Sequence, residues 1–131
     1  MCSETPLQRL RELTPRLSDI AIRRGNSYVE FRSGTSAVIA FGLYKNGDVA
    51  VSRNFIPSGI DFQGHTHAVD VFITVYEGSL EFSVNGDIST LGPGECLHIP
   101  PNVPHSFRSL EDTRTIAVAV PAGEEFPNAL C

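Results

Sequence analysis

The pattern of apolar and polar positions changes near residue 27. Before this point, Leu7, Leu10 and Leu13 recur at a spacing of three, which predicts a short helix with one apolar face. After it, short runs of β-branched and aromatic residues alternate with turn residues, as is typical of strands. The pattern predicts a helical appendage over 1–26, a β-rich body over 27–121 and a tail over 122–131, all within one domain, 1–131.

Short strands dominate the β-rich body. They are predicted over residues 28–31, 37–44, 49–56, 71–76, 80–84, 88–91, 95–99, 105–108 and 113–120. Asn46-Gly47 and Asn85-Gly86 separate two pairs of these runs, and Asn-Gly is the strongest two-residue hairpin signal. Strands at intervals of about 8–12 residues, without helices between them, indicate an all-β sandwich or barrel. We therefore expect a small antiparallel β-barrel.

Composition narrows the class of protein further. The chain has 131 residues, 41% of them apolar and 19% charged, which fits one globular domain. Its formal net charge of −5 argues against nucleic acid as a partner. No apolar run reaches the roughly 18–20 residues of a membrane span, and the first eleven residues lack the apolar region of a secretory signal. We therefore expect a cytoplasmic protein without membrane contact, in which Cys2, Cys96 and Cys131 are free thiols.

Four histidines carry the candidate chemistry: His65, His67, His98 and His105. His65 and His67 are two positions apart, so both side chains point to the same face of an extended segment. This is the spacing required for two ligands of one metal ion. The pair alone is more typical of a surface or structural histidine pair.

Two longer motifs surround these histidines. The first is Gly59-x5-His65-x-His67, followed by Gly78, and the second is Gly94-x5-Pro100-x-Asn102-x2-His105. The two motifs occur in this order, with 15 residues between Gly78 and Gly94. They resemble the two motifs of the cupin family. The resemblance covers residues 59–109, about two-fifths of the chain. It implies a double-stranded β-helix, or jelly roll, and assigns His65, His67 and His105 as ligands of one divalent metal ion inside the barrel.

The chain departs from the family pattern at three positions. The metal-binding glutamate of the family falls on Val71, which has no donor atom. The adjacent Asp70 should lie on the opposite face by strand alternation, and would become a ligand only if a bulge rotated it. Asn102 replaces a motif glycine, and asparagine tolerates the left-handed conformation. Ser109 replaces the final asparagine, so we expect three neutral histidines as the only protein ligands.

Further residues are candidates for the pocket around the metal. By strand parity, Val71 and Ile73 would line the wall that faces the ion, and Phe107 would share the face of His105. Gln63 has the parity of His65 and would bind a ligand or a metal-bound water. The sequence predicts the positions of two further polar residues, Arg53 and His98, less clearly. Arg53 would anchor a carboxylate if it points inward, but a solvated arginine fits better. His98 would lie in the barrel wall or line the pocket.

The predicted metal ligands are compatible with several classes of function. Imidazole ligands suit Fe, Zn, Ni, Mn and Cu, and three of them leave the charge of the ion uncompensated, which favours small anionic ligands. Three-histidine centres of cupins resemble those of iron dioxygenases. A metal-dependent dioxygenase, with Fe favoured, acting on a small anionic or enolisable molecule is therefore the leading interpretation. The alternatives are a non-catalytic binding or sensing cupin and a cupin isomerase or lyase.

Assembly follows from the exposed edges of such a barrel. Proteins usually pair or cover edge strands, and cupins commonly dimerise through them. The segment before residue 28 contains Leu10, Leu13, Leu17 and Ile20, more apolar surface than one barrel edge requires. We therefore predict a homodimer.

Overall fold

The computed structural model describes residues 24–25 and 27–122, and these form ten strands. The strands are β1 (Ser27–Ser33), β2 (Ser36–Lys45), β3 (Ala50–Ile56), β4 (Asp61–His65), β5 (Asp70–Glu77), β6 (Leu80–Val84), β7 (Asp87–Leu91), β8 (Cys96–Ile99), β9 (His105–Ser109) and β10 (Thr113–Val120). No helix occurs among the described residues, and none is therefore long and apolar enough to span a membrane. The predicted N-terminal helix lies outside the described residues.

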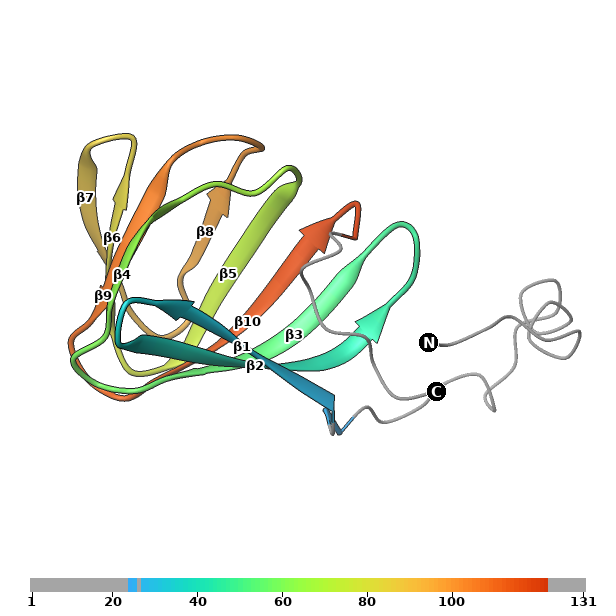
Figure 1. Cartoon of the computed structure of the whole chain (residues 1–131), viewed down its shortest axis with the longest axis horizontal. Helices are drawn as coiled ribbons and strands as arrows, with labels where there is room; N and C mark the ends of the chain where they lie inside the picture. The colour runs from blue at the N-terminus through green and yellow to red at the C-terminus, as the bar shows by residue number, and fades with distance from the viewer. Residues whose placement is uncertain (1–23, 26, 123–131) are drawn as a thin grey trace, which may run out of the picture.

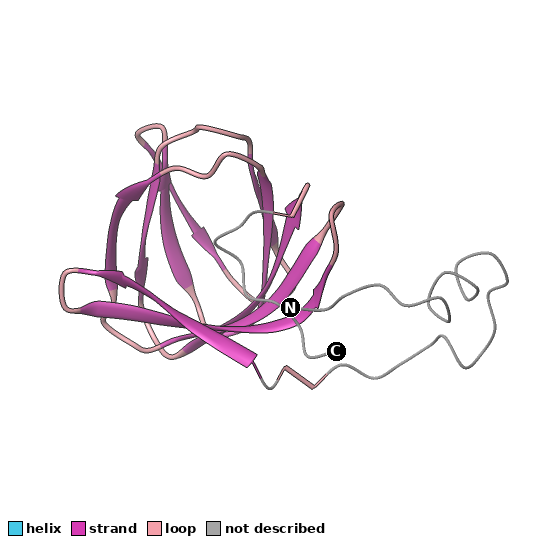
Figure 2. Ribbon diagram, turned by 45° about the vertical axis from the view of Figure 1, so that its right-hand side comes forward, coloured by secondary structure: helices cyan, strands magenta, loops and turns pink. Residues whose placement is uncertain are grey.

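Two antiparallel sheets make up the fold. One has the strand order β1-β2-β3-β10-β5-β8, and the other has the order β4-β9-β6-β7. The sheets curve around a common interior, as Figures 1 and 2 show. This is the cupin-type jelly roll that the resemblance implied, and the expectation of an all-β barrel is confirmed.

Side chains alternate between the interior and the outer surface. Along β10, Thr113, Thr115, Ala117 and Ala119 are buried while the residues between them are partly or fully exposed. Alternation of this kind is what a strand with one face on a core requires. The core that results includes Val71, Val75, Leu80, Phe82 and Ile99.

The two Asn-Gly signals both connect antiparallel strands, but they form different loops. Asn85 and Gly86 have φ values of 52° and 90° and make a two-residue turn between β6 and β7, because a type I′ turn needs positive φ at both central positions. Between β2 and β3 the loop has four residues. There the Asn46 side-chain oxygen accepts hydrogen bonds from the backbone N–H groups of Asp48 and Val49 at 2.8 and 2.9 Å.

Candidate metal centre

A β-bulge in β4 sets the direction of the first histidine. Phe62 pairs with Phe107 and His65 pairs with His105 across β4 and β9, so Gln63 and Gly64 together lie opposite one residue of β9. The extra residue shifts the alternation. As a result, both Phe62 and His65 line the interior although they are three positions apart.

The other two histidines lie at or just beyond the ends of these strands. His67 follows the end of β4, and His105 is the first residue of β9. The His67 carbonyl accepts a hydrogen bond from the Asn102 backbone N–H at 2.7 Å, which ties the loop after β4 to the loop before β9. Asn102 has a φ of 61°, so the expectation that it takes the left-handed conformation is confirmed.

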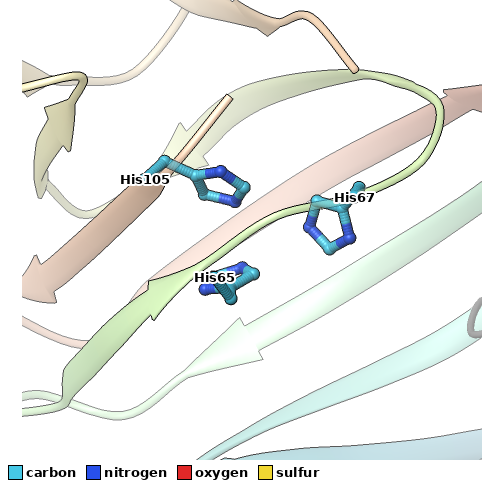
Figure 3. Close-up of side chains that lie close together, drawn as sticks. All are labelled: His65, His67 and His105. Carbon is cyan, nitrogen blue, oxygen red and sulfur yellow. The ribbon is translucent and has the colours of Figure 1, made fainter. Parts of the chain in front are cut away.

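The three imidazole rings lie close together (Figure 3). Their centroids are 5.0 Å apart for His65 and His67, 4.1 Å for His65 and His105, and 5.1 Å for His67 and His105. One nitrogen of each ring lies within 4.8 Å of a nitrogen of both others. Because metal–imidazole bonds are about 2.0–2.1 Å long, two of them span about 4 Å, and only small ring rotations separate this cluster from a common ion.

Backbone carbonyls fix the orientation of two of the rings. His65 Nδ1 donates to the Gln63 carbonyl, and His105 Nδ1 donates to the Val103 carbonyl, each at 3.0 Å. A carbonyl oxygen only accepts, so in the neutral rings the proton lies on Nδ1 and the lone pair lies on Nε2. Such hydrogen bonds are the usual support of metal-ligating histidines.

Burial keeps His105 neutral. The pKa of His105 is lowered from 6.5 to about 4, mainly by the loss of solvent around the ring. The Val103 hydrogen bond raises this pKa, and the neighbouring His65 and His67 lower it. A ring with this pKa is unprotonated at neutral pH, as a metal ligand must be. The donor set of the site therefore fits a divalent transition metal.

A cavity of about 120 Å³ adjoins the three rings. Its walls are mainly apolar and include Val71, Ile73 and Phe107, as strand parity predicted. Val71 is 2% exposed and occupies the position of the family glutamate. No carboxylate side chain is among the described residues that line this cavity, so the charge of a bound cation would be balanced by its ligand rather than by these residues.

The expectation for Gln63 is wrong in one respect. Because the bulge shifts the alternation, the Gln63 side chain is exposed and does not line the cavity. Its backbone carbonyl, however, is the acceptor of the His65 hydrogen bond. Gln63 thus supports the ligand set through its main chain, a role that side-chain parity cannot predict.

Asp70 and His98 form a pair on the outer face of the six-stranded sheet. His98 Nε2 lies 2.7 Å from Asp70 Oδ1, and their side chains are 47% and 39% exposed. The His98 ring also stacks on Phe72, with the ring centroids 4.5 Å apart. Asp70 therefore does not replace the missing glutamate, and His98 belongs to the barrel wall rather than to the pocket.

Arg53 also points away from the cavity. Its guanidinium lies 4.0 Å from the centre of the Phe41 ring and donates a hydrogen bond to the Gly25 carbonyl at 3.4 Å. Arg53 thus does not reach the cavity as a carboxylate anchor, and the favoured outward position is the one observed, because β3 turns its odd-numbered residues outward while Asn54 and Ile56 line the cavity.

Sequence reasoning missed two polar residues of the cavity wall. Asn54 and Thr115 both line the cavity, and Asn54 Nδ2 donates to Thr115 Oγ1 at 3.0 Å. They are 61 positions apart, and their pairing depends on β3 lying beside β10. The one signal in the sequence was that Asn54, a polar residue, falls at an inward-facing position of β3.

Comparison with known proteins assigns the family. The family model described as "Cupin domain" matches residues 53–121, more than half of the chain. The chain belongs to the cupin family. Solved cupin-like structures share the fold: KdgF from Halomonas sp. has a TM-score of 0.69 at 18% identity, covering 80% of this chain and 96% of that one. An RmlC-like cupin from Shewanella frigidimarina has a TM-score of 0.69 at 22% identity, covering 81% and 95%.

One curated relative shares sequence as well. An uncharacterised HTH-type transcriptional regulator of Bacillus subtilis (strain 168), YobQ, is 33% identical over 60 residues. These residues make up 46% of this cupin, which spans only a quarter of the length of the regulator.

Proposed function

We propose that this cupin holds one divalent metal ion through His65, His67 and His105 and binds a small anionic organic molecule beside it. The observation that carries the proposal is the convergence of three imidazoles on a cavity with no carboxylate among its described lining residues. Neutral ligands leave the positive charge of the ion uncompensated. A carboxylate, enolate or phenolate would then be attracted to it in a site of low polarity.

We propose further that the reaction is a metal-dependent dioxygenation, with iron as the metal. When bound, Fe(II) would supply Lewis acidity toward an enolisable substrate and the capacity to react with dioxygen. The residues of this chain would hold the donor nitrogens in place through the Gln63 and Val103 carbonyls. Val71, Ile73 and Phe107 would exclude water around the substrate.

Anaerobic reconstitution tests this function. The purified protein is loaded with Fe(II), exposed to oxygen with a panel of diketones, phenols and thiols, and followed with an oxygen electrode. We expect substrate-dependent oxygen uptake that disappears in His105→Ala. Metal binding without oxygen uptake for any compound would contradict the dioxygenase and leave the binding function standing.

A sensing role is the second candidate, because the sequence match to a transcriptional regulator favours it. The described residues contain no helix, so a sensor of this kind would act on a partner protein or on a segment outside the described residues. Ligand binding without turnover, accompanied by a change in assembly measured by light scattering, would support it. The homodimer and the cytoplasmic location remain predictions, and light scattering that reports a monomer at micromolar concentration would contradict the first.

A further inference from the structure

A pair of polar side chains faces the cavity from the other sheet. Asn54 on β3 and Thr115 on β10 are direct partners in the six-stranded sheet, whereas His65 and His105 belong to β4 and β9 of the four-stranded sheet. All four residues line the same cavity. The cavity therefore has a metal-ligating end and a separate hydrogen-bonding patch in an otherwise apolar wall.

Among the described residues, two hydrogen-bond donor groups of this pair have no acceptor. Ser52 Oγ donates to Asn54 Oδ1 at 3.2 Å, and Asn54 Nδ2 donates to Thr115 Oγ1 at 3.0 Å. Within residues 24–25 and 27–122, the second amide N–H of Asn54 and the hydroxyl hydrogen of Thr115 have no acceptor. Turning the Asn54 amide over would exchange its two partners and would still leave one amide N–H unused.

The donor groups of Asn54 and Thr115 that have no acceptor in the described part of the chain face the cavity, where a bound ligand would accept from them. Thr115 is 1% exposed and Asn54 is partly buried, and both side chains line the cavity; buried polar groups in folded proteins are almost always hydrogen-bonded. The preceding inward residues, Ser52 on β3 and Thr113 on β10, are also polar and buried, but they do not line the cavity. The following inward residues, Ile56 and Ala117, are apolar and do line it. Apart from the histidines, Asn54 and Thr115 are the polar members of a cavity lining that is otherwise apolar among the described residues, and burying polar groups is costly unless they are hydrogen-bonded.

We propose that Asn54 and Thr115 bind an oxygen acceptor of the ligand, at the end opposite to its metal-binding group. The inference rests on the proposed metal site and names the ligand class: a short organic acid with its carboxylate at the ion, a short apolar stretch, and a carbonyl or ether oxygen at Asn54 and Thr115. Val71, Ile73 and Ala117 would contact the apolar stretch. The polar pair thus determines specificity and takes no part in holding the metal.

Matched pairs of acids on the Co(II)-loaded protein test the proposal. The probes are 4-oxopentanoate and 5-oxohexanoate, each compared with its branched hydrocarbon analogue, 4-methylpentanoate and 5-methylhexanoate. The visible absorption of Co(II) reports binding of each acid at the metal. The variants are Asn54→Leu and Thr115→Val, which remove the donors at similar volume, and Thr115→Ser, which keeps the hydroxyl.

We expect the wild-type protein to bind one of the oxo acids about tenfold more tightly than its analogue, because hydrogen bonds to the ligand oxygen are lost in the analogue. Asn54→Leu and Thr115→Val should reduce this ratio toward one, and Thr115→Ser should retain it. The Co(II) affinity of all three variants should stay within about twofold of the wild-type value, which shows that the barrel and the three histidines are intact.

The outcomes separate this inference from the proposed function. Failure of the wild-type protein to bind Co(II) would contradict the metal site itself. Co(II) binding with no preference for either oxo acid, or a preference that survives Asn54→Leu, would overturn the role of the polar pair and leave the metal site standing.

Discussion

The inner and outer faces of the barrel hold histidines in contrasting environments. On the inner face, His65 and His105 donate to backbone carbonyls, and burial lowers the pKa of His105. On the outer face, His98 lies against the carboxylate of Asp70 and is about half exposed. A carbonyl orients an imidazole without adding charge, whereas the contact between His98 and Asp70 is exposed to solvent. The inner face is therefore suited to bind a cation, whereas the outer face holds an exposed hydrogen-bonded pair.

Removing a ligand from the inner face should give the largest effect. His105→Ala should weaken Co(II) or Zn(II) binding by more than about 100-fold, because it removes one of three donors, and changes even to the partners of ligands cost 10–100-fold. Isothermal titration calorimetry measures the affinity. His98→Ala on the outer face is the matched control and should stay within about twofold of the wild-type protein.

His105→Gln keeps more side-chain volume and guards against a folding defect. Circular dichroism of each variant with EDTA would confirm that the barrel is formed. Equal losses of metal affinity in His98→Ala and His105→Ala would contradict the distinction between the two faces.

Lowering the pH should destabilise the metal-free protein, because His105 on the inner face is buried. The pKa of His105 is about 4 in the folded state and 6.5 in the unfolded chain. Between these values the unfolded state binds a proton that the folded state does not bind, so the free energy of unfolding falls as the pH falls from 6.5 to 4. The contribution of His105 is up to about 3 kcal/mol and is fully present above pH 6.5.

Urea unfolding in EDTA between pH 4 and pH 7 measures this dependence. In His105→Gln the difference between the two ends of this range should be smaller by about the same amount, because glutamine does not titrate. An unchanged pH dependence in that variant would show that other groups cause it.

Much of this contrast follows from the sequence. Strand parity placed Val71 on the inner face and favoured the outer face for Asp70, and the spacing of the motifs brought His105 to His65 and His67. Parity failed at Gln63 because the bulge shifts β4 by one residue, and the register between β4 and β9 shows this shift. It missed Asn54 with Thr115 because that contact depends on how two strands far apart in sequence pair.

Introducing a carboxylate at the position of the family glutamate should increase the metal affinity of the inner face. Val71→Glu should tighten Co(II) binding by about tenfold at pH 7, because an anionic ligand would join three neutral ones. The metal-free variant should be less stable, since a carboxylate in this buried position is costly without a partner. Val71→Gln is the control of equal size and should not tighten binding. Tighter binding in both variants would show that cavity filling, rather than charge, is responsible.

The smallest effect is expected on the outer face, one residue away. Asp70→Asn should lower the free energy of unfolding by less than about 1 kcal/mol, because exposed ion pairs contribute about 0–1 kcal/mol. A double-mutant cycle with His98→Gln, measured by urea unfolding at low and high salt, isolates the coupling between the two side chains, and salt should weaken it. Metal affinity should not change. Asp70 and Val71 are adjacent in β5, so a loss of metal affinity in Asp70→Asn would mean that β5 is rotated and Asp70 faces the ion. An unchanged affinity, beside a tenfold gain in Val71→Glu, would establish from solution measurements alone that the barrel wall separates the two positions.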